Sequence, residues 1–264
     1  DTVAAIGDPA QGHLSVGDDY NPGVNLYLPP GCARKVVHLT AADEHRHNFS
    51  LNRVSPPHEE LILPGVHSNL GGGYPTLSYE RLVIGRPVFF LSNHYPLDGP
   101  ARQQLIRSRA WLVRQQEEER FRARGLPGDG HFEHKEEVVG QSPNARVLLT
   151  LSINRTVRGE LSRVSLKVMH AKALQFGVPL DAMNEADVRF SIPSDLAPIA
   201  DKIFSACMKS CCPGLSDQEK HFLHSRYIHS SANWVPVRGF MANKPRHDFI
   251  RAAYPDKPPI EQPV

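Results

Sequence analysis

The feature that most constrains this chain is a histidine that follows a short apolar run and precedes three glycines. Leu61–Leu63 is compact and apolar, which indicates a short buried strand. His67 comes just after this run, and Gly71, Gly72 and Gly73 follow it. Because consecutive glycines lose much backbone entropy on ordering, we expect them to allow close backbone approach or positive φ angles. His67 is therefore the first candidate for a catalytic residue.

Two other apolar runs predict further strands besides the one that leads to His67. Arg34–Thr40 is rich in β-branched and apolar residues, and Glu59–Pro64 is the strand that leads to His67. Val147–Ile153 is also strand-like, and we expect it to form a hairpin with the segment around Phe132–Val139. Strands separated by connections and followed by helices favour the closing half of an α/β sheet.

Most of the rest of the chain is predicted to be helical. We expect residues 78–124 to be mainly helical, with Ala101–Arg122 as the strongest case. Gly159–Phe176 has apolar residues at helical spacing, and Gly177 stands at the expected stop. Leu196–Met208 and Ser216–Leu223 suggest two further helices. The expected fold class is α/β with a largely helical C-terminal region.

We expect three parts along the chain. Residues 1–85 form the first part, residues 86–247 a helical, cap-like part with a short β-hairpin that packs on the first, and residues 248–264 a poorly ordered, Pro-rich tail. Residues 8–33 are predicted to be an irregular excursion. Because Asp1–Gly7 has the pattern of a strand end, we expect the chain to be the C-terminal portion of a longer polypeptide.

Composition and motif spacing argue against several classes of protein. The net charge of +2 gives no general nucleic-acid footprint. No apolar run approaches the roughly 18 residues needed to span a bilayer, and no signal peptide is visible. We expect no metal site, because neither the cysteines nor one group of histidines has the sequence spacing of a known metal-binding motif. The cysteines are Cys32, Cys207, Cys211 and Cys212, and the histidines are His38, His45, His47 and His58.

An aspartate at one predicted strand end, an aspartate at the next and a histidine after a third strand occur in an order that has a chemical meaning. In α/β hydrolases the nucleophile comes first, then Asp or Glu, then His. The carboxylate orients the imidazole, which takes a proton from the serine hydroxyl. Asp1 and His67 satisfy this order, with Asp43 as the alternative acid and His229 as the alternative base. No Gly-x-Ser-x-Gly occurs in the 264 residues, so we expect the nucleophile upstream of Asp1.

Four segments carry a family resemblance. Asp1–Gly7, Ala41–Phe49, Gly65–Tyr74 and Tyr227–Ser231 resemble the catalytic domain of the type VI secretion phospholipase effectors (Tle-type), a bacterial group of α/β-hydrolase lipases. The resemblance extends to about residue 247 and is strongest in residues 1–85. It implies an α/β-hydrolase-like sheet, of which this chain holds the closing strands, and a serine in a Gly-Phe-Ser-Arg-Gly type elbow.

The same resemblance implies roles for individual residues. Asp1 corresponds to the catalytic aspartate, His67 to the catalytic histidine, and Gly71–Gly73 to a loop that shapes the site. No cofactor and no metal are implied. Many members have Asp where this chain has Asn69, which puts full activity in question.

The resemblance also implies substrates, partners and a location. The expected activity is hydrolysis of ester bonds in membrane phospholipids, or in another ester or peptide substrate, by an antibacterial effector. The expected partners are a membrane surface, an immunity protein and a secretion-apparatus protein, with no nucleic acid. Such a protein is made in the bacterial cytoplasm and delivered to the target-cell periplasm by type VI secretion. The absent serine and Asn69 favour an alternative, a catalytically incomplete fragment or binding module for an immunity or chaperone protein.

Overall fold

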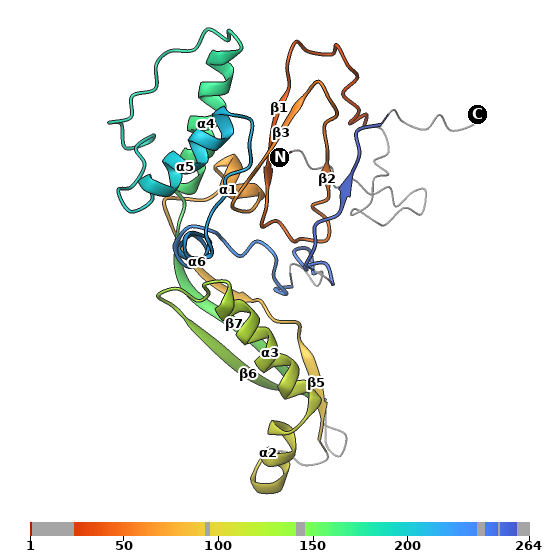
Figure 1. The fold of residues 1–264 in the computed structure, drawn as a ribbon. Helices are drawn as coiled ribbons and strands as arrows, with labels where there is room; N and C mark the ends of the chain where they lie inside the picture. Colours follow the sequence, from red (N-terminus) through yellow and green to blue (C-terminus); the bar gives the residue numbers. More distant parts are fainter. Residues whose placement is uncertain (2–23, 93–95, 141–145, 237–240, 248, 258–264) are drawn as a thin grey trace, which may run out of the picture.

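The structure is a computed structural model that describes residues 1, 24–92, 96–140, 146–236, 241–247 and 249–257 (Figure 1). The predictions for residues 2–23 and 258–264 lie outside this part of the chain. The fold mixes helices and strands, as the expected α/β class requires. No helix in the described ranges is long and apolar enough to cross a membrane.

Two short parallel strands lead to the histidine. β1 (Val37–Ala41) pairs with β3 (Glu59–Leu63), with Val37 opposite Glu59 and Ala41 opposite Leu63. Both strands were expected, and the structure confirms them. Residues 38–41 are all buried, so both faces of β1 are covered. Such continuous burial is typical of parallel strands that lie between layers.

Four helices, three of them from the second half of the chain, pack against this strand pair and form one core with it. They are α1 (His67–Gly71), α4 (Leu161–Gln175), α5 (Ala197–Met208) and α6 (Asp217–Arg226). The predicted helices at 159–176, 196–208 and 216–223 are thereby confirmed. In Figure 1, α1, α4 and α5 lie together beside β1 and β3. This core contains residues from both sides of position 85. The predicted boundary between residues 1–85 and 86–247 stays a prediction.

The lower part of the molecule in Figure 1 is a four-stranded antiparallel sheet. Its centre is β7 (Arg146–Arg158). β6 (His131–Val139) pairs with one edge, and β4 (Leu77–Val83) and β5 (Val88–Leu91) pair with the other. The predicted hairpin is therefore confirmed. α2 (Gly99–Ile106) and α3 (Arg109–Ala123) pack on one face of the sheet, through residues such as Leu105 and Phe121.

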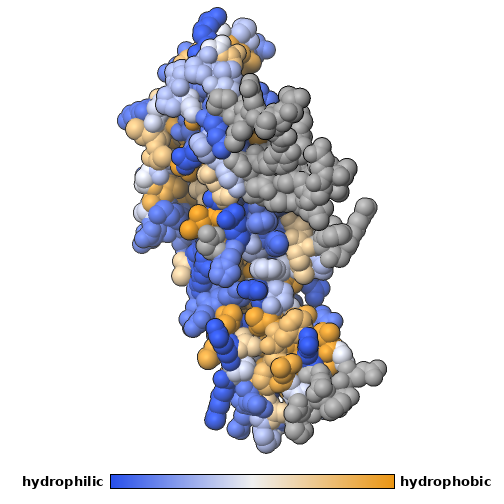
Figure 2. Space-filling view, turned by 90° about the vertical axis from the view of Figure 1, so that its right-hand side faces the viewer, coloured by the Kyte–Doolittle hydropathy of each residue, from blue (hydrophilic) through white to orange (hydrophobic). Residues whose placement is uncertain are grey.

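The opposite face of this sheet carries exposed apolar side chains. Leu77, Phe89, Leu91 and Val139 are all exposed. Figure 2 shows apolar surface gathered over the lower part of the molecule, where these strands lie. Only one face of the sheet is thus covered by helices of the described chain.

The prediction that residues 78–124 are mainly helical was wrong for β4 and β5. Glu80 and Arg81 disguise the alternation of β4, because charged residues rarely occupy a buried position. Glu80 is nevertheless buried, because Arg155 of β7 binds its carboxylate at 2.8 Å. The helix expected at 101–122 is divided at Ser108, whose hydroxyl accepts a hydrogen bond from the Trp111 backbone N–H and caps α3.

The expectation of a poorly ordered tail was wrong for residues 249–257. β8 (Ala253–Tyr254) pairs in parallel with β2 (Leu51–Asn52). Arg251 fixes the segment as well, since its Nε donates to the Phe49 carbonyl at 2.7 Å. Long-range pairing of this kind leaves no local pattern in a Pro-rich sequence.

Replacement of Arg155 should cost more stability than replacement of any exposed arginine of the same sheet. The guanidinium is fully buried and binds Glu80 and the His224 and Ile228 carbonyls. Arg155→Met leaves the buried carboxylate unpaired, so we expect the free energy of unfolding to fall by about 3–5 kcal/mol. Arg81→Met is the matched control, because Arg81 is 71% exposed. Equal denaturation midpoints for the two variants would contradict this account.

Candidate functional site

His67 is the first residue of α1, and glycines set the geometry on both sides of this helix. Gly65 has φ +115°, and its N–H donates to Asp43 Oδ2 at 2.8 Å. Gly72 has φ +73° and ends the helix in the left-handed conformation that glycine favours. Gly71 has no comparable restriction, because open space surrounds the position of a Cβ there. Gly71, Gly72 and Gly73 were all singled out from the sequence. Among these three, Gly72 is the position where the left-handed backbone most clearly requires a glycine.

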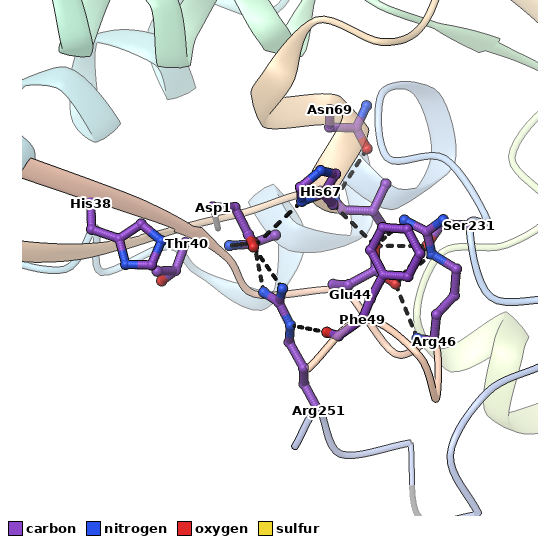
Figure 3. Close-up of polar contacts among 12 residues, drawn as sticks. Asp1, His38, Thr40, Glu44, Arg46, Phe49, His67, Asn69, Ser231 and Arg251 are labelled. Atoms are coloured by element: carbon purple, nitrogen blue, oxygen red, sulfur yellow. Dashed lines mark hydrogen bonds and ion pairs between the residues drawn. The ribbon is translucent and has the colours of Figure 1, made fainter. Parts of the chain in front are cut away.

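The structure brings Asp1 and His67 together (Figure 3). Asp1 Oδ1 lies 3.4 Å from His67 Nδ1. The aspartate side chain is only 2% exposed and the histidine side chain is 32% exposed. Nδ1 itself is buried and has no well-aligned hydrogen bond, so the contact is one of ion-pair distance. The exposed part of the ring is therefore on its other atoms.

Arg251 holds the Asp1 carboxylate from the opposite side. Its two terminal nitrogens bind Oδ1 and Oδ2, each at 2.6 Å. The Ala41 backbone N–H, at the end of β1, also donates to Oδ2 at 2.8 Å. Bidentate arginine–carboxylate pairs fix orientation as well as charge. The carboxylate is thereby oriented with Oδ1 towards His67.

Glu44 supports the backbone of the histidine. Its side chain is fully buried and accepts from Arg46 Nε at 2.9 Å, from Arg46 Nη2 at 2.8 Å and from the His67 N–H at 3.3 Å. The Ser231 hydroxyl also donates to it. Burial alone would raise the pKa of Glu44, but Arg46 and these N–H donors hold that pKa below its usual value.

Phe49 packs against the imidazole and limits its movement. The Phe49 and His67 rings meet edge to face with centroids 5.4 Å apart. The Arg46 guanidinium lies over the Phe49 ring, 3.2 Å from its centroid. The ring of His67 is thus held between Asp1 and Phe49, as Figure 3 shows.

The surroundings of His67 favour its neutral form. Burial lowers the pKa of His67, Glu44 opposes this effect, and the positive charges of the Asp1 amino group, Arg46 and Arg251 lower the pKa further. A histidine with a pKa below its usual value is unprotonated near neutral pH and can accept a proton. These are the properties of a general base.

Arg251→Gln should raise the pKa of His67. The change removes a positive charge that disfavours imidazolium and leaves the Asp1 carboxylate without its ion-pair partner. Both effects favour the protonated ring, so the NMR titration midpoint of His67 should move to higher pH. Arg53→Gln is the control, because Arg53 is 52% exposed and pairs with Glu60 instead. A downward shift, or equal shifts in both variants, would refute the stated cause.

His67 and Asp1 lie at a cavity of about 460 Å³ between α1 and α4. Its apolar wall comprises Leu39, Leu70, Leu166 and Met169. Gly71 and Gly72 line it as well, and the absence of side chains there keeps the space open. The rest of the lining is polar or charged, so the imidazole faces a cavity with one apolar wall and one polar side.

The alternative acid, Asp43, binds other groups. Its carboxylate accepts from the Gly65 N–H and lies 3.2 Å from His224 Nε2 and 3.5 Å from Arg124. Burial would raise the pKa of Asp43, but His224, Gly65 and Arg124 lower it on balance. Asp43 therefore supports the turn before α1 and is paired with a different histidine.

The alternative base, His229, is buried beneath the site. It is 3% exposed and stacks on Tyr74 with ring centroids 3.6 Å apart. Burial, with Arg155, lowers the pKa of His229 to about 3. It does not line the cavity that Asp1 and His67 share.

Asn69 joins α1 to the segment that carries His229. Its Oδ1 accepts from the Val66 and His229 backbone N–H groups, each at 3.2 Å. Its Nδ2 donates to the Tyr227 carbonyl at 3.1 Å and lies 3.0 Å from His229 Nδ1. A carboxylate at this position could not donate to that carbonyl, so the neutral amide suits these surroundings.

Sequence reasoning missed the supporting residues of the site, which are Glu44, Arg46, Phe49, Ser231 and Arg251. Glu44 and Arg46 lie within the Ala41–Phe49 segment, directly after a predicted strand. Two opposite charges at a strand end were the sequence signal that could have identified them as site residues. Arg251 is far from Asp1 in the sequence, and nothing local marks it. Within the described ranges, no three His, Cys, Asp or Glu side chains form a group suited to a metal ion.

The fold of this chain also occurs among solved structures. The chain is similar to a Tle1 effector in a structure with the VgrG spike of the type VI secretion system, with a TM-score of 0.72 and 24% sequence identity. The match covers 89% of this chain and 53% of that one, so this chain spans about half the length of the effector. At this identity the match establishes a shared fold. No family model and no curated protein sequence matches the chain.

Proposed function

We propose that this chain is the base-carrying half of a serine-type lipase that hydrolyses ester bonds of membrane phospholipids. The observation that carries the proposal is the pair of Asp1 and His67, in which a buried carboxylate faces Nδ1 of a partly exposed imidazole beside a cavity with an apolar wall. The fold shared with a Tle1 effector and the sequence resemblance to phospholipase effectors support the same activity.

The geometry supports different roles for Asp1 and His67. Asp1 favours the tautomer with the proton on Nδ1 and stabilises the imidazolium once it forms. Nε2 is then free to take a proton from a serine hydroxyl and to return it to the leaving alcohol. Arg251 and the Ala41 N–H hold the carboxylate still, and Glu44 holds the backbone at His67.

We propose that the nucleophilic serine comes from a segment N-terminal to Asp1. Two serines line the cavity, but their hydroxyls are engaged. Ser162 donates to the Gly159 carbonyl at 3.0 Å, and Ser165 lies 2.8 Å from the Leu70 carbonyl. The chain also spans only about half the length of the Tle1 structure, which leaves room for an elbow in the other half.

The proposal is tested by labelling the full-length protein with a fluorophosphonate and mapping the modified residue. We expect a serine upstream of Asp1 to be labelled and p-nitrophenyl esters to be hydrolysed, with both reactions suppressed together when that serine is changed to alanine. Absence of both labelling and hydrolysis in folded protein would overturn the proposal. That result would favour the catalytically incomplete binding module.

The Tle1 structure also motivates a proposal about delivery. That effector is bound to the VgrG spike. We propose that this protein likewise associates with a spike protein and reaches the target-cell periplasm by type VI secretion. Co-purification of the full-length protein with a VgrG spike protein from the same bacterium should show a complex, and separate elution at micromolar concentration would count against this route.

A further inference from the structure

The cavity beside His67 contains one cation that the described protein leaves largely unused. Asp1 is bound by Arg251, and the two serines donate to carbonyls. Arg189 also lines the cavity, but its guanidinium binds the Asp187 carboxylate at 2.6 Å. Arg163 is different, because its guanidinium donates to the Ser191 carbonyl at 2.7 Å and not to a carboxylate.

Arg163 therefore keeps unused hydrogen-bonding capacity. A guanidinium has five N–H donors, and a carbonyl takes up only a small part of them. Among the described residues, the structure places no carboxylate in an ion pair with Arg163. Since Asp1 is neutralised by Arg251 and Asp187 by Arg189, the remaining charge at the cavity is positive. The cavity is complementary to an anion.

Two apolar side chains continue the row that Arg163 begins. Arg163, Leu166 and Met169 follow one another at intervals of three along α4, which places them on one side of the helix. Leu166 is 43% and Met169 38% exposed, and both line the cavity. Leu70 lies on the facing wall. An amphiphile with an anionic head and an acyl chain would cover this exposed apolar surface.

We propose that Arg163 binds the phosphodiester of a phospholipid whose acyl chain lies along Leu166, Met169 and Leu70. Arginine forms bidentate hydrogen bonds with phosphate oxygens. This contact selects phospholipids over neutral esters with the same acyl chain, while Asp1 and His67 act on the ester. The inference rests on the proposed phospholipid hydrolysis and assigns the residue that determines its specificity.

The kinetic test compares dihexanoyl phosphatidylcholine with p-nitrophenyl hexanoate in the full-length protein. Arg163→Gln should lower kcat/KM for the phospholipid by about 10- to 100-fold, the range expected for a lost charged hydrogen bond. The ratio of phospholipid to neutral-ester turnover should fall accordingly. Arg163→Lys should recover part of the ratio, because it retains the charge without the planar fork. Arg81→Gln, on the distant sheet, should leave the ratio unchanged.

A binding measurement separates failure of this inference from failure of the proposed function. In a His67→Ala background, calorimetry should show that Arg163→Gln weakens binding of dihexanoyl phosphatidylcholine about 10-fold. Unchanged binding and an unchanged turnover ratio would overturn the role of Arg163 while leaving the hydrolase intact. Glycerophosphocholine that binds as tightly as the lipid would overturn the acyl site. If neither ester is hydrolysed, the proposed function fails, and the binding result still tests Arg163.

Discussion

His67→Ala is expected to reduce p-nitrophenyl ester hydrolysis by the full-length protein by about 10³-fold or more, which is effectively to background. The imidazole is the group placed to accept the serine proton, and alanine offers no substitute. The variant should still fold, because the supporting contact to Glu44 comes from the His67 backbone N–H. Near-wild-type circular dichroism and thermal midpoint would verify this.

His131→Ala is the matched control for that experiment. His131 is an exposed residue of β6 whose ring contacts Asn154 and not the cavity. Its removal should leave turnover within about twofold of the wild type, as surface changes usually do. Retained turnover in folded His67→Ala protein would exclude His67 as the base. His229→Ala would then be the next variant to measure.

The strand ends that carry the site could be predicted from the sequence because the signals are local. Leu61–Leu63 is apolar and short, and the glycines after His67 mark a backbone position with restricted conformation. The pairing of Asp1 with His67 was predicted from residue order and family resemblance, and the structure places them 3.4 Å apart. Their catalytic roles remain predictions.

The parts that sequence reasoning missed depend on contacts between distant segments. Glu80 puts a charge at a buried position of β4, which conceals the strand pattern in the sequence. The charge is tolerated there because Arg155 of β7 pairs with it. Arg251 lies in a Pro-rich stretch that was predicted to be poorly ordered, yet its guanidinium orients the Asp1 carboxylate. Asn69 stood out as a departure from a family pattern, whereas its hydrogen bonds show an amide matched to a carbonyl and two N–H groups.

Asp1→Asn should lower kcat of the full-length protein by about 10³- to 10⁴-fold, the size of effect known when the acid of a serine triad becomes an amide. Arg251 donates to both carboxylate oxygens, but the Ala41 N–H adds a second donor at Oδ2, so the amide oxygen should remain at Oδ2 while the Arg251 hydrogen bond to the Oδ1 position is lost. The amide nitrogen then faces His67 Nδ1 and donates to it. This contact moves the ring proton to Nε2, where the imidazole can no longer accept a proton from serine.

Asp43→Asn separates the two candidate acids. The Asp43 carboxylate is bound by Gly65, His224 and Arg124 and not by His67. Asp43→Asn should therefore lower the stability of the fold and leave the tautomer of His67 unchanged. We expect Asp43→Asn to retain most of kcat, while Asp1→Asn loses it and also changes the acid limb of the pH–rate profile. Because the carboxylate at Asp1 both fixes the tautomer and stabilises imidazolium, kcat should fall far more than KM rises. A larger loss of kcat in Asp43→Asn would transfer the role of the acid to Asp43.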